Sequence, residues 1–276
     1  MPTLLECYKL GKSKGVSDYD IRELIAHING YQDTSGFFLH SKDEIADYDA
    51  FCRDLSKLEQ GIPLSYILGY SLFLGEKYIV NNNVLIPRPE TEELVLLALK
   101  RKLSCYKNKK TTVLDLGTGS GCIACEIQRR MPNATVIASD ISLPALEVAK
   151  KNISNFGFNI KTYHSDALEK INRKVDMIVS NPPYIPNVNE ADKNVLENEP
   201  YSALFIEGTS VYERILSNFE KVARFPFVMV FEIDPSLEQP LIEMMNKYLG
   251  DKYDFSFSFT QDINKKIRFL TIGVNK

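Results

Sequence analysis

From about residue 111 onward, short apolar runs alternate with segments of helical character. Strands are expected near 112–116, 134–139, 160–164, 175–180 and 226–233, and helices near 120–131, 142–156, 208–222 and 235–249. This alternation predicts an α/β fold, in which a parallel sheet is covered by helices on both faces and ligands bind at the carboxyl ends of the strands. Residues 253–259 and 267–274 predict an antiparallel hairpin that closes the sheet.

A glycine-rich loop follows the first strand of this region. The apolar run 113–116 leads into Gly117-Thr118-Gly119-Ser120-Gly121, and an apolar helix continues through Ile127. Glycines let the backbone turn sharply and approach a ligand closely, and the helix N-terminus adds a positive dipole. Asp140 ends the next strand roughly twenty residues later, where a carboxylate can hold ribose hydroxyls. The pattern predicts a nucleotide-type cofactor site.

A second motif, Asn181-Pro182-Pro183-Tyr184, follows the apolar run 175–180. Pro182 disfavours helical backbone at Asn181, and neither proline offers an N–H group. The Asn181 side-chain oxygen and the Pro182 carbonyl are therefore free to accept both protons of one NH₂ group. Tyr184 can cover the flat face of that group. We expect a site for an amino group on a planar system, either an exocyclic base amine or a carboxamide.

The two motifs together favour one cofactor. The loop reads Gly-x-Gly-x-Gly, whereas dinucleotide sites read Gly-x-Gly-x-x-Gly. Asp115, just before the loop, suits the ammonium group of S-adenosyl-L-methionine, or it could be a strand-end carboxylate that accepts loop N–H groups. A methyl donor explains a site for NH₂ at Asn181, and a hydride carrier does not. We therefore expect a methyltransferase that uses S-adenosyl-L-methionine.

Composition narrows the possible class of protein further. The 276 residues carry a formal net charge of −3, which counts against a processive nucleic-acid enzyme. No apolar stretch is long enough to span a bilayer, and the N-terminus lacks the features of a secretion signal. Five scattered cysteines predict reduced thiols in the cytoplasm. Cys122 and Cys125 are expected to pack in the core, and no metal site is expected.

The first part of the chain, residues 1–70, predicts a small helical bundle. Ser17 is placed to cap one helix, and Ser41-Lys42-Asp43-Glu44 is a capping-box pattern that predicts the start of another. The bundle contains no catalytic constellation. It is either a scaffold or a docking module for a macromolecule.

Two further segments complete the predicted organisation. Residues 71–90 predict a β-hairpin linker around Asn81-Asn82-Asn83, and residues 91–276 hold the α/β domain. The polar loop from Ile185 to about Gly208 is long, and long loops beside a site usually act as lids or contact substrate.

Four segments, in order, make the chain similar to a known family. They are Pro-Leu-Ser-Tyr-Ile-Leu-Gly at 63–69, Leu-Ile-Pro-Arg-Pro-Glu-Thr-Glu at 85–92, Leu-Asp-Leu-Gly-Thr-Gly-Ser-Gly at 114–121 and Asn-Pro-Pro-Tyr-Ile at 181–185. The set resembles the HemK/PrmC-type methyltransferases, which modify the glutamine of the Gly-Gly-Gln motif in peptide chain release factors. The likeness covers about residues 60–235 most strongly.

The resemblance implies a seven-stranded Rossmann-like S-adenosyl-L-methionine-dependent domain, preceded by a helical domain that helps recognise the release factor. It implies that the methyl donor contacts Asp115, Gly117, Thr118, Gly119, Ser120, Gly121, Asp140, Asp166, Ala167 and Asn181. It implies that the substrate amide is bound by Asn181, Pro182, Pro183 and Tyr184.

Two positions depart from the family pattern. Ala167 and Leu168 stand where an aromatic residue often follows the aspartate, and Asp234 stands where a glycine is usual. The roles of Arg88 and Glu90 stay open between an interdomain ion pair and direct contact with ligand.

The expected reaction is methyl transfer to N5 of the release-factor glutamine, by a cytoplasmic monomer without direct nucleic-acid or membrane contact. Asn181, Pro182 and Tyr184 are the expected catalytic residues. The first two orient and polarise the amide, since hydrogen bonds of about 0.5–1.5 kcal/mol each are too weak to carry the reaction alone. The alternatives are a ribosomal-protein glutamine methyltransferase, an amino-adenine nucleic-acid methyltransferase and a non-enzymatic S-adenosyl-L-methionine sensor.

Overall fold

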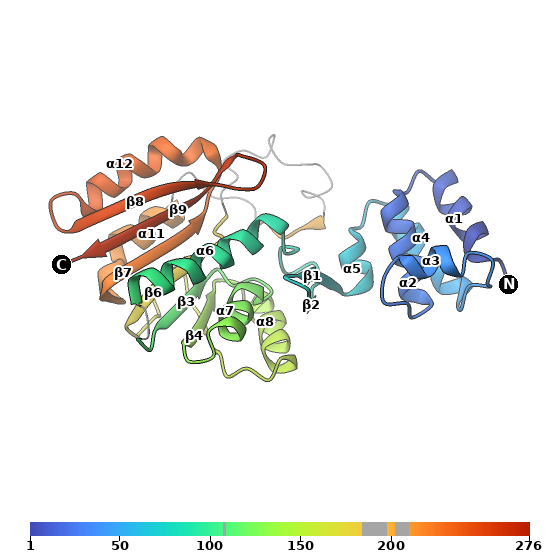
Figure 1. Cartoon of the computed structure of the whole chain (residues 1–276), viewed down its shortest axis with the longest axis horizontal. Helices are drawn as coiled ribbons and strands as arrows, with labels where there is room; N and C mark the ends of the chain where they lie inside the picture. Colours follow the sequence, from blue (N-terminus) through green and yellow to red (C-terminus); the bar gives the residue numbers. More distant parts are fainter. Residues whose placement is uncertain (107–108, 184–197, 202–209) are drawn as a thin grey trace. The chain divides into compact units, whose positions relative to one another are not determined.

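The computed structural model describes residues 1–106, 109–183, 198–201 and 210–276 (Figure 1). These residues fall into two compact units, one built mainly from Met1–Tyr70 and the other from most of the chain after Ser71. Within the described ranges, none of the helices has both the length and the apolar composition that a membrane crossing requires.

The first unit is helical. Its helices are α1 (Leu4–Ser13), α2 (Asp18–Ile28), α3 (Ser35–Leu39), α4 (Tyr48–Glu59) and α5 (Leu64–Leu68). Its core is formed by side chains that recur at helical spacing, among them Leu4, Ile21, Leu24, Phe51 and Leu55. The predicted cap of α2 is confirmed, because Ser17 Oγ accepts from the Asp20 N–H group at 3.0 Å.

The predicted helix start at residues 41–44 is wrong. The helix begins at Tyr48, and the Asp47 carboxylate caps it by accepting from the Ala50 N–H group at 2.9 Å. Residues 41–44 instead run beside the N-terminus, where Thr3 and Glu44 form an antiparallel bridge. This pairing across the unit outweighs the local capping signal.

The second unit is built around a sheet in which seven strands are described, in the order β5-β4-β3-β6-β7-β9-β8. The strands are β3 (Thr112–Leu116), β4 (Thr135–Asp140), β5 (Lys161–His164), β6 (Val175–Ser180), β7 (Ala223–Glu232), β8 (Asp254–Gln261) and β9 (Ile267–Asn275). Strands β3 to β7 run parallel, and β9 pairs antiparallel with β7 and β8. The parallel sheet and the closing hairpin are thus confirmed.

Helices cover both faces of this sheet, as Figure 1 shows. Leu114 and Ile178 belong to an apolar core shared with one pair of helices, α11 (Ser210–Asn218) and α12 (Glu238–Leu249). Their chain neighbours Val113 and Met177 belong to a second core, shared with α6 (Pro89–Tyr106), α7 (Cys122–Arg130) and α8 (Leu143–Asn155). Successive strand residues point to opposite faces, so a strand buried on both faces reads as a continuous apolar run.

Several smaller features complete the unit. The 3₁₀ turns η2 (Phe219–Lys221) and η3 (Pro235–Leu237) precede β7 and α12. Cys122 and Cys125 are buried in the second core, which confirms their predicted packing role. Burial raises the pKa of the Cys122 thiol to about 12, so it stays protonated and unreactive at neutral pH.

The hairpin lies earlier than the sequence pattern predicts. Strands β1 (Tyr70–Phe73) and β2 (Glu76–Ile79) form a two-stranded sheet whose turn is Leu74-Gly75, with φ of 48° and 86°. Positive φ at both central residues is what a tight type I′ hairpin requires. The asparagines at 81–83 make a separate bend, in which the Asn83 N–H group donates to Asn81 Oδ1 at 3.0 Å.

Strands β3 and β6 are direct neighbours, although β4 and β5 lie between them in the sequence. The chain leaves β3 toward one edge of the sheet and then returns past β3 to build the other half. Such a reversal leaves a crevice at the carboxyl ends of the two strands, where ligands bind in open α/β sheets. The glycine loop and the Asn181 motif both begin at this point.

Candidate active site

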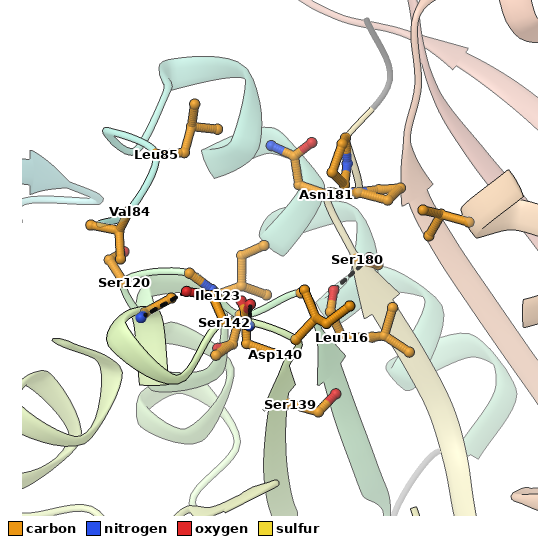
Figure 2. Close-up of a pocket in the computed structure, with 18 of the residues that line it drawn as sticks. Val84, Leu85, Leu116, Ser120, Ile123, Ser139, Asp140, Ser142, Ser180 and Asn181 are labelled. Atoms are coloured by element: carbon orange, nitrogen blue, oxygen red, sulfur yellow. Dashed lines mark hydrogen bonds between the residues drawn. The ribbon is translucent and has the colours of Figure 1, made fainter. Parts of the chain in front are cut away.

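A cavity of about 410 Å³ lies at this switch point. That volume is within the range of small-molecule sites. In Figure 2, Asn181 lies on one side of the cavity, Asp140 and Ser142 lie on another, and Val84 and Leu85 lie on a third. Loops after β2, β3, β4 and β6 therefore converge on one space, as the sequence motifs predict for the last three.

The glycine loop after β3 presents open backbone to this cavity. Gly117 and Gly119 have φ of +72° and +55°, and a Cβ atom added at either position would meet no atom within 4 Å. The N–H groups of Gly117 and Thr118 both donate to the Ser139 carbonyl at 2.8 Å. Glycine adopts positive φ without steric cost, so the loop turns tightly and leaves room beside its backbone.

Gly121 has a different role from the other two loop glycines. A Cβ atom here would lie 3.2 Å from both Cα and Cβ of Ala149 on α8. Gly121 is also absent from the residues that line the cavity. The missing side chain lets α7 approach α8 closely, and the predicted contact of Gly121 with the methyl donor stays a prediction.

Asp115 also lies outside the cavity lining, in contrast to its predicted contact with the donor. It is fully buried, and its Oδ2 accepts from Thr118 Oγ1 at 2.5 Å and from the Ala124 N–H group at 3.0 Å. Burial raises the pKa of Asp115 to about 7, and these two hydrogen bonds oppose the rise. The donors to Asp115 are thus a loop hydroxyl and an N–H group of α7, and both its predicted contact with the methyl donor and the alternative of accepting loop N–H groups stay predictions.

Asp140 lines the cavity with both carboxylate oxygens partly engaged. Oδ2 accepts from the Gly119 N–H group and Oδ1 from the Ser142 N–H group, each at 2.9 Å. Burial raises the pKa of Asp140, and these backbone donors oppose the rise. Each oxygen keeps capacity for another donor, such as a ribose hydroxyl. Ser139 Oγ, at the same strand end, is buried without a hydrogen-bond partner among the described residues.

The Asn181 side chain points its amide nitrogen at α6. Its Nδ2 donates to Thr91 Oγ1 at 3.0 Å, so Oδ1, at the other end of the planar amide group, points away from Thr91. Pro182 and Pro183 line the cavity beside it. Tyr184 lies outside the described residues, so its stacking role stays a prediction. Thr91 was not singled out from the sequence, where the segment 87–94 indicates a helix start.

Asp166 and Ala167 line the cavity too. The Arg214 guanidinium binds Asp166 through Nη1, at 2.7 Å from each carboxylate oxygen, and Arg214 also lines the cavity. Ala167 has a φ of 43°, and Leu168 is buried in the first sheet core. The position after Asp166 thus offers a methyl group where relatives in the resembled family often have a ring. Arg214 was missed because nothing in its local sequence marks it.

The open question about Arg88 is partly answered. Arg88 forms an ion pair with Glu199, whose carboxylate is buried and also accepts from the Ile86 N–H group at 3.3 Å. Both partners belong to the second unit, so this ion pair of Arg88 is not interdomain. Arg88 lines the cavity as well, which leaves contact with a ligand as a proposal.

The residues present fit S-adenosyl-L-methionine. A carboxylate that can accept ribose hydroxyls, an open glycine backbone and the buried Ser139 hydroxyl, to which no described residue is hydrogen-bonded, all face or border one cavity. Among the described residues, no group of three or more His, Cys, Asp or Glu side chains is placed to hold a metal ion.

Known proteins share this fold. Residues 93–199 match a family model described as methyltransferase small domain. The T. thermophilus 16S rRNA N2 G1207 methyltransferase, solved with AdoMet and guanosine, has a TM-score of 0.53 at 18% identity over 75% of this chain and 50% of that chain. The ribosomal protein L11 methylase of Lactobacillus delbrueckii subsp. bulgaricus has a TM-score of 0.50 at 18% identity over 75% and 90% of the two chains.

Fold, cavity and matched domain together define a methyltransferase that depends on S-adenosyl-L-methionine. The release factor glutamine methyltransferase of Flavobacterium psychrophilum is 41% identical over 201 residues, which cover 70% of each chain. That of Enterococcus faecalis is 35% identical over 229 residues, 80% of this chain and 81% of its own. The chain belongs to the release factor glutamine methyltransferase family, which confirms the resemblance seen in its sequence.

Proposed function

We propose that this protein transfers a methyl group from S-adenosyl-L-methionine to N5 of the glutamine in the Gly-Gly-Gln motif of peptide chain release factors. The observation that carries the proposal is the Asn181 amide at the cavity, which is held through its nitrogen by Thr91, so that its oxygen points away from that residue. Family membership supports the choice of substrate, since the relatives named above are release factor glutamine methyltransferases.

The donor side of the cavity would be formed by the glycine loop and the end of β4. Asp140 would accept the ribose hydroxyls, and the backbone of Gly117 and Gly119 would border the amino-acid part of the cofactor. The Asp166 region would lie near the adenine. The bound cofactor supplies an electrophilic methyl carbon on a positively charged sulfur. Asp115 would support this side by holding Thr118 and the start of α7.

The acceptor side would orient a poor nucleophile. The lone pair of a carboxamide nitrogen is delocalised into its carbonyl group, so the nitrogen needs both polarisation and placement. Asn181 Oδ1 and the Pro182 carbonyl would each accept one N–H proton, contributing about 0.5–1.5 kcal/mol apiece. In-line placement against the methyl carbon supplies more, roughly 7–11 kcal/mol in well-aligned cases. Tyr184 would stack on the flat amide.

The test uses labelled S-adenosyl-L-methionine and a purified release factor, with a release factor whose Gly-Gly-Gln glutamine is changed to alanine as the control. Label on the first and none on the second supports the proposal, and equal label on both overturns it. Parallel reactions with ribosomal proteins and with DNA and RNA oligonucleotides test the two alternative substrates. Mass spectrometry of the labelled peptide should show one added methyl group on the glutamine.

The remaining roles are also proposals. Residues 1–70 would help recognise the release factor, residues 71–90 would link the two domains, and residues 91–276 would carry the reaction. The net charge of −3 supports an enzyme that binds a protein and not nucleic acid. Five free cysteines support a reducing compartment such as the cytoplasm. Light scattering during gel filtration tests the proposed monomer, and a dimer mass at micromolar concentration would contradict it.

A further inference from the structure

A chain of two hydrogen bonds runs away from the catalytic amide into the protein. Asn181 Nδ2 donates to Thr91 Oγ1 at 3.0 Å, and Thr91 Oγ1 donates to Glu232 Oε2 at 2.8 Å. Thr91 is 3% exposed and Glu232 is 1% exposed, so both are shielded from solvent. The three residues are separated by 90 and 141 positions in the sequence.

We propose that Thr91 and Glu232 are positioning residues, which hold the Asn181 amide with its oxygen toward the amino group that is methylated. The inference rests on the proposed function. Neither residue contacts the reacting atoms in this scheme. They act only through Asn181.

The direction of each hydrogen bond follows from the proton count. A hydroxyl group has one proton, and Thr91 donates it to Glu232 Oε2. The Thr91 oxygen is then left with lone pairs alone, and it can be satisfied only by a donor. Of the two ends of the Asn181 amide, only Nδ2 is a donor. Oδ1 must therefore point away from Thr91.

The orientation matters because the two ends of an asparagine amide have almost the same shape. If the amide turned over, Nδ2 would face the substrate NH₂ group, and two donors cannot form a hydrogen bond. The acceptor that orients the substrate would be lost, although the shape of the cavity would hardly change. A steric fit alone does not distinguish these two states, whereas the polarity of the Glu232–Thr91 pair does.

The fold places the three groups together. In the parallel pairing of β6 with β7, Ser180 lies opposite Phe231, so the next residues, Asn181 and Glu232, leave neighbouring strand ends. Glu232 is also paired with Phe269 of β9, and its carbonyl accepts from Tyr212 Oη at 3.0 Å. Contacts on both sides therefore hold the Glu232 backbone.

The third residue of this hydrogen-bonded group comes from a helix. Thr91 lies in the first turn of α6, and its N–H group donates to the Arg88 carbonyl at 3.1 Å. The turn carries Thr91 to the position between the two strand ends. Thr91, at the start of α6, thus connects Asn181 at the end of β6 with the buried carboxylate of Glu232.

The experiment compares two changes at one position. Thr91→Val keeps the shape and removes the hydroxyl, and Thr91→Ser keeps the hydroxyl. The proposal predicts that kcat on the release factor falls about tenfold or more in T91V, which corresponds to about 1.4 kcal/mol of transition-state stabilisation. It predicts a dissociation constant for S-adenosyl-L-methionine within about twofold of the wild-type value, and recovery of kcat to within about threefold in T91S.

The matched control is Thr271→Val on β9. Thr271 is also buried, and Oγ1 has no hydrogen-bond partner among the residues that the structure describes. The same chemical change at Thr271 should leave kcat and cofactor affinity unchanged. Glu232→Leu removes the acceptor at the far end of the chain, so Thr91 is free to donate to Asn181 Oδ1, and kcat should fall about as much as in T91V.

A second measurement does not depend on turnover. In a ¹H–¹⁵N spectrum, the side-chain NH₂ resonance of Asn181 is assigned by its absence in N181A. One of its protons is donated to the buried Thr91 hydroxyl in the wild-type protein, so that proton should exchange slowly with solvent. In T91V the resonance should move and exchange faster, and in T91S it should return.

The proposal is supported by the loss in kcat without loss of cofactor affinity, together with rescue by serine and the spectral change. It is overturned if T91V keeps kcat within about twofold of wild type, or if the Asn181 resonance is the same in T91V. A failure of the proposed function can be told apart from a failure of this positioning role. In that case the wild-type protein would leave the release factor unmethylated, while the spectra would still report on the Asn181 amide. If T91V does not fold, the proposal is tested instead by kcat of E232L and by the rate at which the Asn181 side-chain proton of the wild-type protein exchanges with solvent.

Discussion

The glycine loop after β3 and the Asn181 segment after β6 meet at the same edge of the sheet, yet they are held in different ways. Loop 117–121 is held through its backbone, since the N–H groups of Gly117 and Thr118 donate to the Ser139 carbonyl. The Asn181 segment is held through a side chain, since Asn181 Nδ2 donates to Thr91 of α6.

This difference separates two properties of the enzyme. Changes in the backbone-held loop should alter the binding of the methyl donor, because that loop would border the donor in the proposed function. Changes around the side-chain-held segment should alter turnover at constant donor affinity, because that segment would face the substrate amide. Ordinary enzyme kinetics resolve the two effects, since a group that acts only in the transition state changes kcat while binding is preserved.

The largest effect is expected for Asn181→Ala. The change removes both the hydrogen bond to the reacting amide and part of its in-line placement, and the loss of such a preorganised group costs about 10²–10³-fold in kcat. Isothermal titration should show donor affinity within about threefold of wild type. Asn133→Ala on the exposed surface is the matched control. An N181A enzyme that kept more than about a tenth of the wild-type kcat would contradict the role of Asn181 as an acceptor for the reacting amide.

The next effect is a dependence of stability on pH. Burial raises the pKa of Asp115 from 3.8 to about 7 in the folded protein. Between these values the folded state binds a proton that the unfolded chain has released. The free energy of unfolding therefore falls as pH rises toward 7, by about 2–3 kcal/mol from pH 5, and the fall stops above pH 7.

Urea unfolding at pH 5 and pH 8 measures this effect. Asp115→Asn removes the titration, so the wild-type protein should lose about 2–3 kcal/mol more than the variant over that interval. Asp251→Asn, at an exposed position, should behave as the wild type. Equal pH dependence in wild type and D115N would show that the carboxyl group of Asp115 does not titrate as its burial requires.

A smaller effect is expected at the loop glycines, and it distinguishes two of them. Gly117→Ala places a methyl group in open space, but a positive φ costs about 1–2 kcal/mol for a residue with a Cβ atom. The loop should relax, and the dissociation constant of S-adenosyl-L-methionine should rise about tenfold. Gly121→Ala instead places its Cβ 3.2 Å from Ala149, so the melting temperature should fall with less change in affinity.

Titration calorimetry measures the dissociation constant of the donor for both glycine variants, and thermal melting measures their stability. If G121A weakened donor binding as much as G117A, the packing role assigned to Gly121 would be wrong. If G117A bound the donor as the wild type does, the loop backbone would not be part of the donor site.

The smallest effect is expected for Ser180→Ala. Ser180 Oγ donates to the Leu116 carbonyl at 2.6 Å, and this bond joins the ends of β6 and β3 (Figure 2). Its loss should cost about 1 kcal/mol, or about 2–4 °C in melting temperature. Both kcat and donor affinity should stay within about twofold, with the exposed Ser154→Ala as the control. A tenfold loss of kcat would mean that loop 117–121 and the Asn181 segment do not affect donor binding and turnover separately.

Most of the sheet was predictable from the order of residues along the chain. Strands β3 and β6 lie where their apolar runs predict them, because strands buried on both faces leave an unbroken apolar signal. The glycine loop and Asn181 were also identified, since local backbone requirements of glycine and proline mark them. The start of α4 was misplaced, because the pairing of Glu44 with Thr3 outweighed the local cap signal. The hairpin turn was misplaced because the asparagines at 81–83 form a separate bend, while the turn itself is Leu74-Gly75.

The sequence by itself determined which backbone can turn at residues 117–121 and which groups at Asn181 and Pro182 can accept a proton, since both follow from the chemistry of adjacent residues. Only the tertiary structure decided which way the Asn181 amide points. Thr91 and Glu232 lie 90 and 51 positions away from it and reach it only through the start of α6 and the pairing of β6 with β7. A hydrogen-bond direction depends on atoms that meet in space, and nothing in the order of residues records which atoms these are.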